Sequence, residues 1–486
     1  MSTVKITQLE IILDDLSPDS RKLENVEWNH PLEPNLVLNF ESQSDGKQYS
    51  LNLNPNDIES SEPILLPFGT YSLTGKSNST EAVDYLSFSI EEQVQISNPE
   101  TNLSIQAKTT SGLFTIPTTS LRAAPLLLDA SRNLAEKQGF YYAYSDPKSP
   151  IGFELAPKSG TISFRRYWTP DYLLHENLEL EYPEGSINNS FQTEGFTFRG
   201  ITTAIDSDGY PLSLNTRPLA KLPASQNENS GLAISQGRVF SINDGGNNAE
   251  IYELNPETGD VIKTIRVINA TNTDWEDLAQ SETHLFIGDF GNNTGNRTDL
   301  NILKIRWTDL LSLSEVEAEK IHFSYEDQID FSGSNPNHNF DCEGFIYFNG
   351  ELSLFTKNRG DLRSNHYILP SETGTHVAVK VNGLDVNGLV SAADYDEESQ
   401  TLVLLGYKLS GISSQCFVWY IRDFQVGDFF GGVARRLDIG SPLSLGQTEG
   451  ISFLGTRNLL ISSERLSSGG FEIPPQFNLL DLKGLY

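Results

Sequence analysis

Five short segments of this chain repeat one pattern, and the repeat restricts the fold more than any other feature of the sequence. The segments are SGLAIS, EDLAQS, EGFIYF, SAADYD and EGISFL, and they begin at residues 230, 276, 343, 391 and 449. Each is followed by a second apolar segment that ends in polar residues, such as VFSIND or LLISSER. Further apolar segments then follow. A period of roughly 40 to 50 residues with four strands per unit is typical of β-propeller blades.

The last repeat unit is too short for a complete blade. Residues 449–486 have room for about three strands at the usual strand and turn lengths, so closure of the ring would need a strand from before the first unit. Residues 217–223 (RPLAKLP) are the expected donor. The segment TEGFTF at residue 193 also resembles the repeat. We therefore expect five blades and keep six as the alternative.

The N-terminal part of the chain has a different pattern. Residues 1–200 contain irregularly spaced segments of alternating apolar and polar residues, without a repeat, which favours half-buried strands of packed sheets. The best helical candidate, residues 123–139, contains Pro125. The predicted fold is all-β, with an N-terminal β-sandwich of one or two subdomains (1–200), a linker (201–216) and a β-propeller (217–486).

Charge and cysteine content exclude several classes of function. Lys and Arg number 34 against 65 Asp and Glu, for a net charge of −31. Such an acidic chain is not drawn to nucleic-acid phosphates or to anionic lipid. The two cysteines cannot build a disulfide framework or a cysteine zinc cluster. We find neither a signal peptide nor an apolar run long enough to span a membrane, so any targeting segment or anchor would lie outside this sequence.

Two loops share the motif D-x-G-N-N, and they begin at Asp244 and Asp289. Each follows a second apolar segment of the repeat. Gly and Asn tolerate a positive φ, so one interpretation is a repeated turn. The other is a pair of oxygen-rich loops on one face, which would suit a hard cation or sugar hydroxyls.

Several of these segments resemble known propeller proteins. DWEDLA, GDFGNN, DCEGF, LFTKN, TEGISF and ISSE, within residues 217–486, resemble a family of secreted propellers common in Bacteroidetes and mostly without assigned function. The EG-type segments are more remotely similar to SdiA-regulated propellers, phytase-like esterases and the gluconolactonase and paraoxonase group. The segment PFGTYSLTG is similar to fimbrillin and transthyretin-like sandwiches.

The gluconolactonase resemblance implies a metal site. In that group an inner-strand Glu, with Asn and Asp from other blades, holds a divalent cation at the ring axis. The resemblance assigns Glu276, Glu343 and Glu449 as metal ligands for Ca²⁺ or Mg²⁺. Ser230 and Ser391 stand where the pattern would have further glutamates, so they depart from it.

The repeat also predicts which residues surround these glutamates. Inner strands would begin, and second strands would end, near one mouth of the central channel, where Asn358 and Glu464 would also lie. Converging carboxylates need either a bound cation or basic partners, and both alternatives stay open, as does catalytic use of the cluster. The predicted ligand-binding residues are Asn243, Asp244, Asp289, Lys357, Tyr407, Lys408 and Arg465.

The sequence contains none of the motifs of several other common catalytic mechanisms. The sequence lacks G-x-S-x-G, H-E-x-x-H, a P-loop and a strand-linked G-x-G-x-x-G. Among the seven histidines His338 is the one candidate general base, although a simple loop histidine explains it as well.

We therefore expect an extracellular or cell-surface protein that binds a small polar ligand, a glycan or a protein partner, with Ca²⁺ or Mg²⁺ as the candidate cofactor. The competing hypothesis is a metal-dependent hydrolase of lactones, esters or phosphoesters. The third is an envelope structural protein.

Overall fold

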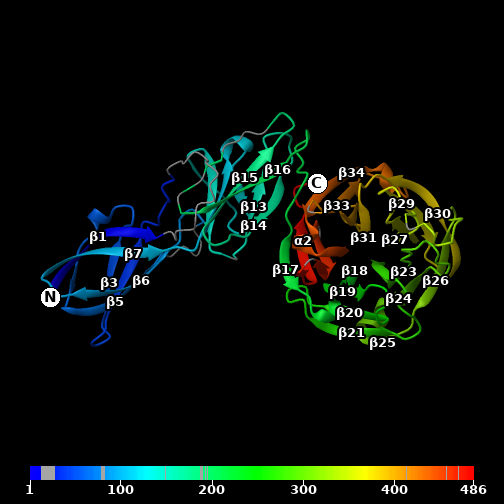
Figure 1. Cartoon of the computed structure of the whole chain (residues 1–486), viewed down its shortest axis with the longest axis horizontal. Coiled ribbons are helices and arrows are strands. Elements are labelled where there is room, and N and C mark those ends of the chain that lie inside the picture. Colours follow the sequence, from blue (N-terminus) through cyan, green and yellow to red (C-terminus); the bar gives the residue numbers. More distant parts are fainter. Residues whose placement is uncertain are drawn as a thin grey trace. The chain divides into compact units, whose positions relative to one another are not determined.

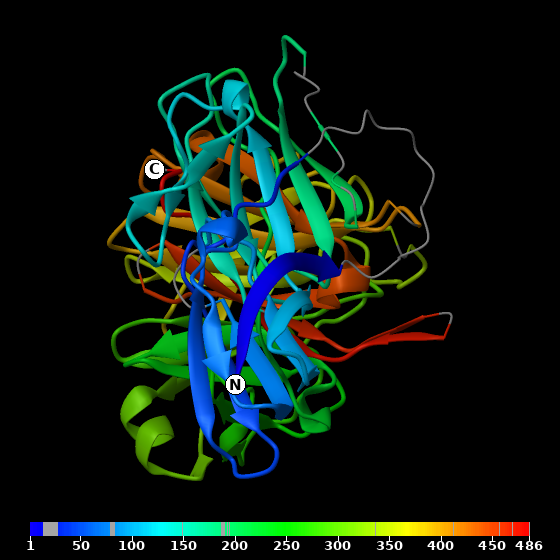
Figure 2. The ribbon, with the colours of Figure 1, turned by 90° about the vertical axis from the view of Figure 1, so that its left-hand side faces the viewer.

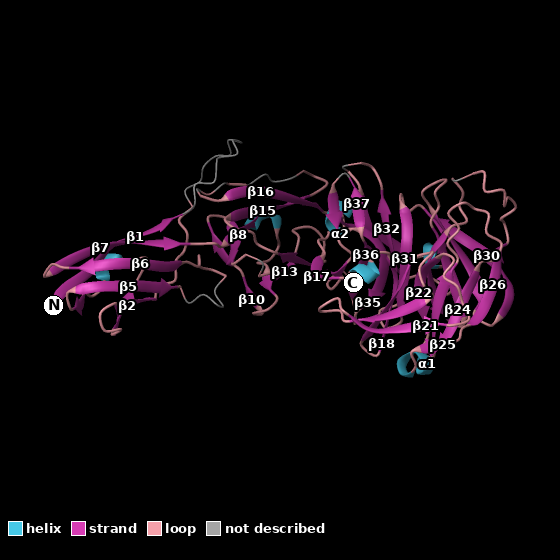
Figure 3. Ribbon diagram, turned by 60° about the horizontal axis from the view of Figure 1, so that its bottom comes forward, coloured by secondary structure: helices cyan, strands magenta, loops and turns pink. Residues whose placement is uncertain are grey.

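The computed structural model describes residues 1–12, 28–77, 83–147, 149–185, 190–191, 193, 195–335, 337–411, 413–455, 457–468 and 470–485. Regular structure in these residues is almost entirely β-strand (Figure 3), which confirms the prediction of an all-β protein. None of the helices in the described residues is long and apolar enough to cross a bilayer. The chain divides into two compact units, residues 1–211 and 212–484.

A seven-stranded sheet forms the first part of the N-terminal unit. Its strands alternate buried and exposed residues, as in the strand that buries Leu36, Leu38 and Phe40 and exposes the residues between them. Successive side chains point to opposite faces of a strand, so the alternation gives the sheet one apolar face. The order of strands is β3 (Gln48–Leu53), β2 (Leu36–Ser42), β5 (Gly69–Lys76), β6 (Ser89–Ile96), β7 (Glu100–Lys108), β1 (Ser2–Ile12) and β4 (Ile64–Leu66).

Two smaller sheets complete the N-terminal unit, and aromatic side chains pack between them. Phe114 of one sheet stacks on Phe153 of the other, with ring centroids 4.7 Å apart, and Trp168 packs beside them. The first sheet contains β11 (Ala135–Lys137), β12 (Phe140–Ser145), β8 (Gly112–Pro117), β15 (Leu174–Glu181) and β16 (Thr197–Ala204); the second contains β10 (Arg132–Asn133), β9 (Leu126–Leu127), β13 (Ile151–Leu155) and β14 (Phe164–Trp168).

Two alternatives that the sequence left open for the N-terminal unit are not found in the structure. Residues 123–139 form the short strands β9, β10 and β11 instead of a helix. Pro125 has no N–H to donate, and Ser131 and Gln138 adopt positive φ, so turns interrupt the segment. The segment TEGFTF is not part of a sixth blade, because β16, which begins within it, pairs with β15 of this unit. Glu194 of that segment lies outside the described residues.

Five groups of four antiparallel strands, which we call sheets, form the second unit, and Figure 1 shows the unit as a ring. Parallel pairing of β26 (Glu319–Tyr325) with β30 (Gly374–Leu384) joins the second and third groups into one continuous eight-stranded sheet, and β25 (Glu315–Val316) adds a short parallel strand to the first. The innermost strand of each sheet contacts the innermost strands of both neighbouring sheets, so the five strands surround a common axis. The strands of each sheet follow from the innermost outwards. The first sheet is β18 (Asn229–Ser235), β19 (Arg238–Asn243), β20 (Glu250–Leu254) and β21 (Val261–Val267). The second sheet is β22 (Trp275–Gln280), β23 (His284–Asp289), β24 (Asn301–Arg306) and β26 (Glu319–Tyr325). The third sheet is β27 (Cys342–Phe348), β28 (Glu351–Thr356), β29 (Ser364–Pro370) and β30 (Gly374–Leu384). The fourth sheet is β31 (Leu389–Asp396), β32 (Thr401–Lys408), β33 (Gln415–Arg422) and β34 (Val433–Gly440). The fifth sheet is β35 (Gln447–Phe453), β36 (Asn458–Glu464), β39 (Gln476–Asp481) and β17 (Arg217–Lys221).

The fifth sheet joins the two ends of the second unit. Its outermost strand, β17, comes from before the first sheet and pairs antiparallel with β39, with Arg217 opposite Leu479 and Lys221 opposite Gln476. Pro218 lies in this edge strand, where a missing N–H costs least. A hairpin of β37 (Leu466–Ser468) and β38 (Phe471–Ile473) between β36 and β39 projects from the ring (Figure 2).

All five innermost strands carry a register shift near the start of the repeat segment, one residue later in β18 than in the other four. The shifts lie between Ser230 and Leu232, Trp275 and Leu278, Cys342 and Gly344, Val390 and Ala392, and Thr448 and Gly450. A bulge of this kind turns side chains out of the regular alternation. The glycines beside it allow neighbouring inner strands to approach closely: a Cβ at Gly344 would lie 2.9 Å from the backbone of Ala392.

Candidate functional site

The three glutamates predicted from the repeat lie at these bulges. Glu276 is in β22, Glu343 in β27 and Glu449 in β35, and each is almost completely buried. Because the bulge occurs at the same repeat position in each sheet, it brings these side chains toward the same end of the ring axis. The ring therefore holds several carboxylates in a region from which water is largely excluded.

Lys357 is the central cation of this region. It follows β28, and its Nζ lies 2.9 Å from Glu343 Oε1 and 5.4 Å from the centre of the Tyr407 ring. Arg359 lies 3.1 Å from Asp341 Oδ2 and 3.8 Å from Glu343 Oε1. Glu343 and Asp341 are therefore neutralised by basic side chains of their own sheet.

Only one of the two carboxylate oxygens of Glu449 has a hydrogen-bond partner among the described residues. Its Oε1 accepts a hydrogen bond from Gln447 Nε2 at 2.6 Å. Its Oε2 is buried and has no hydrogen-bond partner among the described residues. Glu464, at the end of β36, is the neighbouring carboxylate on the same sheet and interacts electrostatically with Glu449.

A second group of carboxylates comes from the first two sheets. Oxygen atoms of Asp244, Asp274 and Glu276 all lie within 4.8 Å of one another. Asp244 and Asp274 are half-buried and Glu276 is buried, so the group is partly accessible to solvent. We call these three residues the acidic triad. Within the part of the chain that the structure describes, no other set of three Asp, Glu, His or Cys side chains is arranged to hold a metal ion.

Both D-x-G-N-N loops make room for the acidic triad. A Cβ at Gly245, in the first loop, would overlap Asp274 Oδ1, and a Cβ at Gly291, in the second loop, would overlap Glu276 Oε1 and the Asp274 carboxylate. Only glycine leaves this space free at either position. The two loops therefore form a cradle for the carboxylate oxygens.

The two loops differ in how they use their remaining residues. Asp244 belongs to the acidic triad, whereas Asp289 pairs with Arg297 at 3.0 Å and accepts hydrogen bonds from Asn301 and the backbone N–H of Asp274. The first Asn of each loop acts structurally: Asn247 donates to Asp244 O and Glu228, and Asn292 donates to Phe340 O. The first loop therefore contributes one carboxylate to the acidic triad, whereas the carboxylate of the second loop is bound by framework residues.

Burial and mutual repulsion make the carboxylates hard to ionise together. Burial, and after it the negative charges of Glu343 and Asp244, raise the pKa of Glu276 well above its ordinary value. Burial and the charges of Asp244 and Asp341 raise the pKa of Asp274 to about 6, and burial with Glu449 and Asp244 raises the pKa of Glu464 to about 8. Burial lowers the pKa of Lys357, but Glu343, Tyr407 and Glu449 outweigh it, so the pKa lies well above its usual value.

Glu276 and Glu343 are the carboxyl groups that join the acidic triad to Lys357. The charge of Glu343 raises the pKa of Glu276, and the ammonium of Lys357 lies 2.9 Å from Glu343 Oε1. An anionic pocket and a lysine ammonium are therefore adjacent.

Several residues of the predicted ligand-binding set lie elsewhere or act in the framework. Lys408 donates to Asn387 Oδ1 at 2.6 Å, and Arg465 is exposed near Glu472. Asn243 lies beside Asp244 but donates to Ser225 O, and its buried Oδ1 has no partner among the described residues. Asn358 holds the loop after β28 by donating to Asp361 Oδ1. Asp244, Lys357 and Tyr407 are the members of the set that lie among the buried carboxylates.

The sequence interpretation missed two carboxylates. Asp274 and Asp341 each stand two residues before a predicted glutamate, in Asp274-Trp275-Glu276 and in Asp341-Cys342-Glu343. This repeated D-x-E pattern was the available signal. Asp341 is fully buried and accepts from the backbone N–H of Asn292 at 2.7 Å, which ties the second sheet to the third.

The serines that replace glutamate in the repeat bind neighbouring inner strands. Ser230 Oγ donates to Glu276 O, and Ser391 Oγ donates to Thr448 O at 2.7 Å. Asp277 also links inner strands, but as an acceptor: its Oδ2 accepts hydrogen bonds from the backbone N–H groups of Phe345 and Ala393. These side chains hold the ring together, and the acidic triad therefore involves the first and second sheets alone.

Comparison with known proteins gives a distant structural similarity. No protein-family model matches the sequence, and no curated protein matches it. Among solved structures, a β-xylosidase aligns with a TM-score of 0.27 and 10% identity over 46% of this chain and 73% of its own. A putative 6-phosphogluconolactonase from Bacteroides uniformis ATCC 8492 aligns with a TM-score of 0.24 and 9% identity over 84% of this chain and 97% of its own. The chain thus resembles these two proteins only distantly and in structure, without a sequence family.

Proposed function

We propose that the second unit is a five-bladed β-propeller of an extracellular or cell-surface protein, and that it binds a divalent cation at the acidic triad together with a polar ligand, glycan or protein partner at the mouth. The observation that carries this proposal is the triad itself: three carboxylates within 4.8 Å of one another, in a cradle that two glycines keep open. Such an arrangement is unfavourable for anions alone and favourable around a cation.

Calcium fits the triad best. Ca²⁺ prefers carboxylate and carbonyl oxygens in a flexible geometry, and Mg²⁺ takes fewer protein ligands and keeps more water. Asp244, Asp274 and Glu276 offer oxygen ligands only. Their partly open side leaves room for water or for a ligand hydroxyl to complete the coordination. Extracellular calcium-binding modules work with weak sites of this kind, at dissociation constants of roughly 10⁻⁴ to 10⁻³ M.

A metal-dependent hydrolase of lactones, esters or phosphoesters is the second candidate, and one observation favours it. Glu343 is a buried carboxylate next to the acidic triad, and Lys357 lies 2.9 Å from it. A cation at the triad would supply Lewis-acid polarisation of a carbonyl or phosphoryl oxygen. Glu343 would take a proton from the water that attacks the carbonyl or phosphoryl centre and return it to the leaving oxygen as the bond to that oxygen breaks, while Lys357 would hold Glu343 in place.

The melting temperature measured in EDTA and then in added Ca²⁺ or Mg²⁺ tests the cation. An ion that binds only the folded state must raise the melting temperature by mass action. We expect a rise of several degrees with Ca²⁺ and a smaller rise with Mg²⁺. The variant Asp274→Asn should abolish this rise and should be as stable as the wild type, or more stable, in EDTA, because one repulsive charge is gone.

Asp57→Asn is the matched control, since Asp57 is exposed in the first unit and its side chain caps no helix. It should keep the full response to Ca²⁺. An ion-induced rise that persists in Asp274→Asn, or no rise in the wild type, would refute the cation site. If the rise is seen, hydrolysis of lactone and ester substrates by wild type and Glu343→Gln decides between binding protein and hydrolase.

A further inference from the structure

A polar pocket lies on the same end of the ring as the acidic triad but shares no residue with it. Its volume is about 440 Å³, within the range of roughly 300 to 1,000 Å³ typical of small-molecule sites. The walls come from the β23–β24, β26–β27 and β28–β29 loops and from β29 and β30. The lining residues are Thr294, Gly295, Asp330, Gly333, Asn335, Asn337, His338, Asn339, Phe340, Gly360, Asp361, Asn365 and Lys380.

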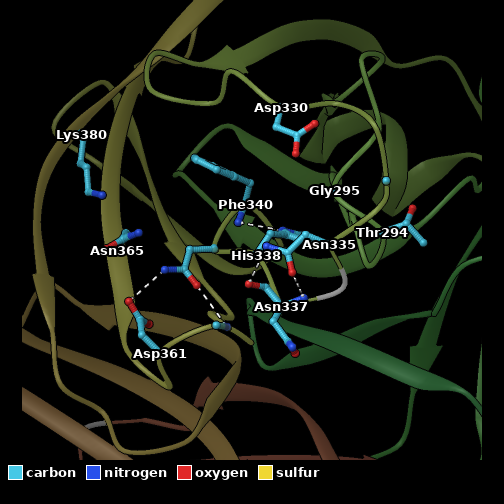
Figure 4. A pocket seen from close by; sticks show the side chains of 13 residues that line it. Thr294, Gly295, Asp330, Asn335, Asn337, His338, Phe340, Asp361, Asn365 and Lys380 are labelled. Atoms are coloured by element: carbon cyan, nitrogen blue, oxygen red, sulfur yellow. Dashed lines mark hydrogen bonds between the residues drawn. The ribbon is translucent and has the colours of Figure 1, made fainter.

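Hydrogen bonds hold the centre of the pocket in place. The Phe340 backbone N–H donates to His338 Nδ1 at 3.1 Å, and His338 Nε2 lies 3.3 Å from Asn293 O. Asn339 bridges two loops, because it donates to Asp361 and accepts from the Gly360 N–H. Figure 4 shows His338 and Phe340 between Lys380 and Asp361 on one side and Thr294 and Gly295 on the other.

The charges in the pocket are already partnered or exposed. Asp361 accepts from Asn358, Asn339 and the Arg363 N–H. Lys380 forms an ion pair with Asp327 at 3.2 Å. The remaining carboxylate, Asp330, is exposed. The pocket therefore has no spare positive charge for a phosphate or carboxylate, and in the described residues it has no set of metal ligands.

Amide side chains and one aromatic ring are what the pocket offers a ligand. Asn335, Asn337, Asn339 and Asn365 lie in its wall. Asn335 and Asn339 each donate one hydrogen bond and accept one within the loops. An amide side chain has two N–H groups and two lone pairs, so a donor and an acceptor remain on each for a ligand. Hydroxyl groups need partners of both kinds. Phe340 is half-buried and packs against Tyr325, so part of its ring presents a flat apolar surface. Neutral amides around an aromatic face match a molecule with many hydroxyls and an apolar ring face.

We propose that this pocket binds a neutral saccharide, independently of the acidic triad. The sugar hydroxyls would exchange hydrogen bonds with the asparagine amides, and one sugar face would pack on Phe340. The proposal goes beyond the cation site, since it adds a second site on the second and third sheets and identifies the ligand as an uncharged glycan.

Saturation-transfer NMR and calorimetric titration with cellobiose, maltose, xylobiose and mannobiose test this proposal. We expect at least one disaccharide to bind, and its dissociation constant to rise at least tenfold in Asn337→Ala and in Phe340→Ala. Asn337 is exposed, so its variant should fold normally even if Phe340→Ala is destabilised. Asn98→Ala, an exposed asparagine of the first unit, is the matched control and should bind like the wild type.

The Asp274→Asn variant and EDTA separate this proposal from the cation site. Saccharide binding should survive both, and should also survive if Ca²⁺ fails to raise the melting temperature. The proposal is wrong if none of the four disaccharides binds, or if Asn337→Ala binds as tightly as the wild type. It is equally wrong if Asp274→Asn abolishes binding, because the saccharide would then lie at the acidic triad.

Discussion

Lys357 contributes more to the charge balance of the mouth than any other residue, because it is the fully buried cation among several buried carboxylates. Its Nζ is 2.9 Å from Glu343, and only 5% and 3% of the two side chains are exposed. Replacing Lys357 by Met keeps the length of the side chain and removes the charge. Breaking a buried pair in this way costs about 3 to 5 kcal/mol, since one charge is left without a partner. We expect Lys357→Met to lose that much in the free energy of unfolding, measured by urea denaturation in EDTA.

The same substitution should strengthen cation binding. Lys357 and a divalent ion compete to neutralise the same carboxylates, so removal of the lysine leaves more negative charge for the ion. We expect Ca²⁺ to raise the melting temperature more in Lys357→Met than in the wild type. Lys408→Met, which removes a half-exposed lysine that donates to Asn387, is the control. It should change stability by no more than about 0.5 kcal/mol, and equal losses in both variants would contradict the role given to Lys357.

At the scale of the strands, the repeat predicted where the polar residues of the ring lie better than which of them act together. Positions 230, 276, 343, 391 and 449 all fall at the bulge of an innermost strand. A periodic sequence marks equivalent positions because equivalent strands need the same geometry. Glu276, Glu343 and Glu449 could therefore be placed at one end of the axis from the sequence.

The acidic triad could not be read from that repeat. Asp274 joins Asp244 through a contact between two sheets, and the space for it comes from glycines in two separate loops. Lys408 lies at the end of β32, where the repeat places it, and its side chain donates to Asn387, a contact that the repeat does not predict. The direction of a long side chain depends on packing between sheets, which periodicity does not encode.

Gly231 tests the close approach of inner strands directly. It has φ of +56°, and a Cβ there would lie 2.8 Å from the backbone nitrogen of Leu278 on the next inner strand. We expect Gly231→Ala to lose about 2 to 4 kcal/mol, from left-handed strain and from the clash with a backbone that cannot move aside. Gly237→Ala is a closely matched control, because Gly237 has φ of +74° and nothing within 4 Å of its Cβ position.

Gly237→Ala should cost about 1 kcal/mol, from backbone strain alone. The difference between the two alanine variants, measured by urea denaturation, therefore reports the crowding at the ring axis. Similar losses for both would mean that the inner strands can separate to accept a methyl group, and the tight axis described here would be wrong.

At the scale of the molecule, the ring depends on one pairing between segments far apart in the chain. β17 precedes the first sheet and β39 ends the last, and their pairing gives the fifth sheet its full four strands. The pairing places strands from both ends of the second unit in one sheet, so the two ends stabilise each other. The pairing of β17 with the last sheet was predicted from the sequence, because residues 449–486 are too short to supply all four strands of that sheet.

Removing residues 476–486, which contain β39, should therefore unfold the whole second unit and not only its last sheet. The loss leaves β17 and β36 without the strand that pairs with both of them, so the contact between β35 and β18 alone would have to hold the first and last sheets together. We expect loss of the cooperative unfolding transition assigned to this unit, measured by differential scanning calorimetry. Replacing Leu466–Ile473 by two glycines is the matched control, because it removes a hairpin that lies outside the five sheets. That variant should keep the transition within a few degrees. If both deletions had the same small effect, the pairing of β17 with β39 would not close the ring, and each sheet would be stable without it.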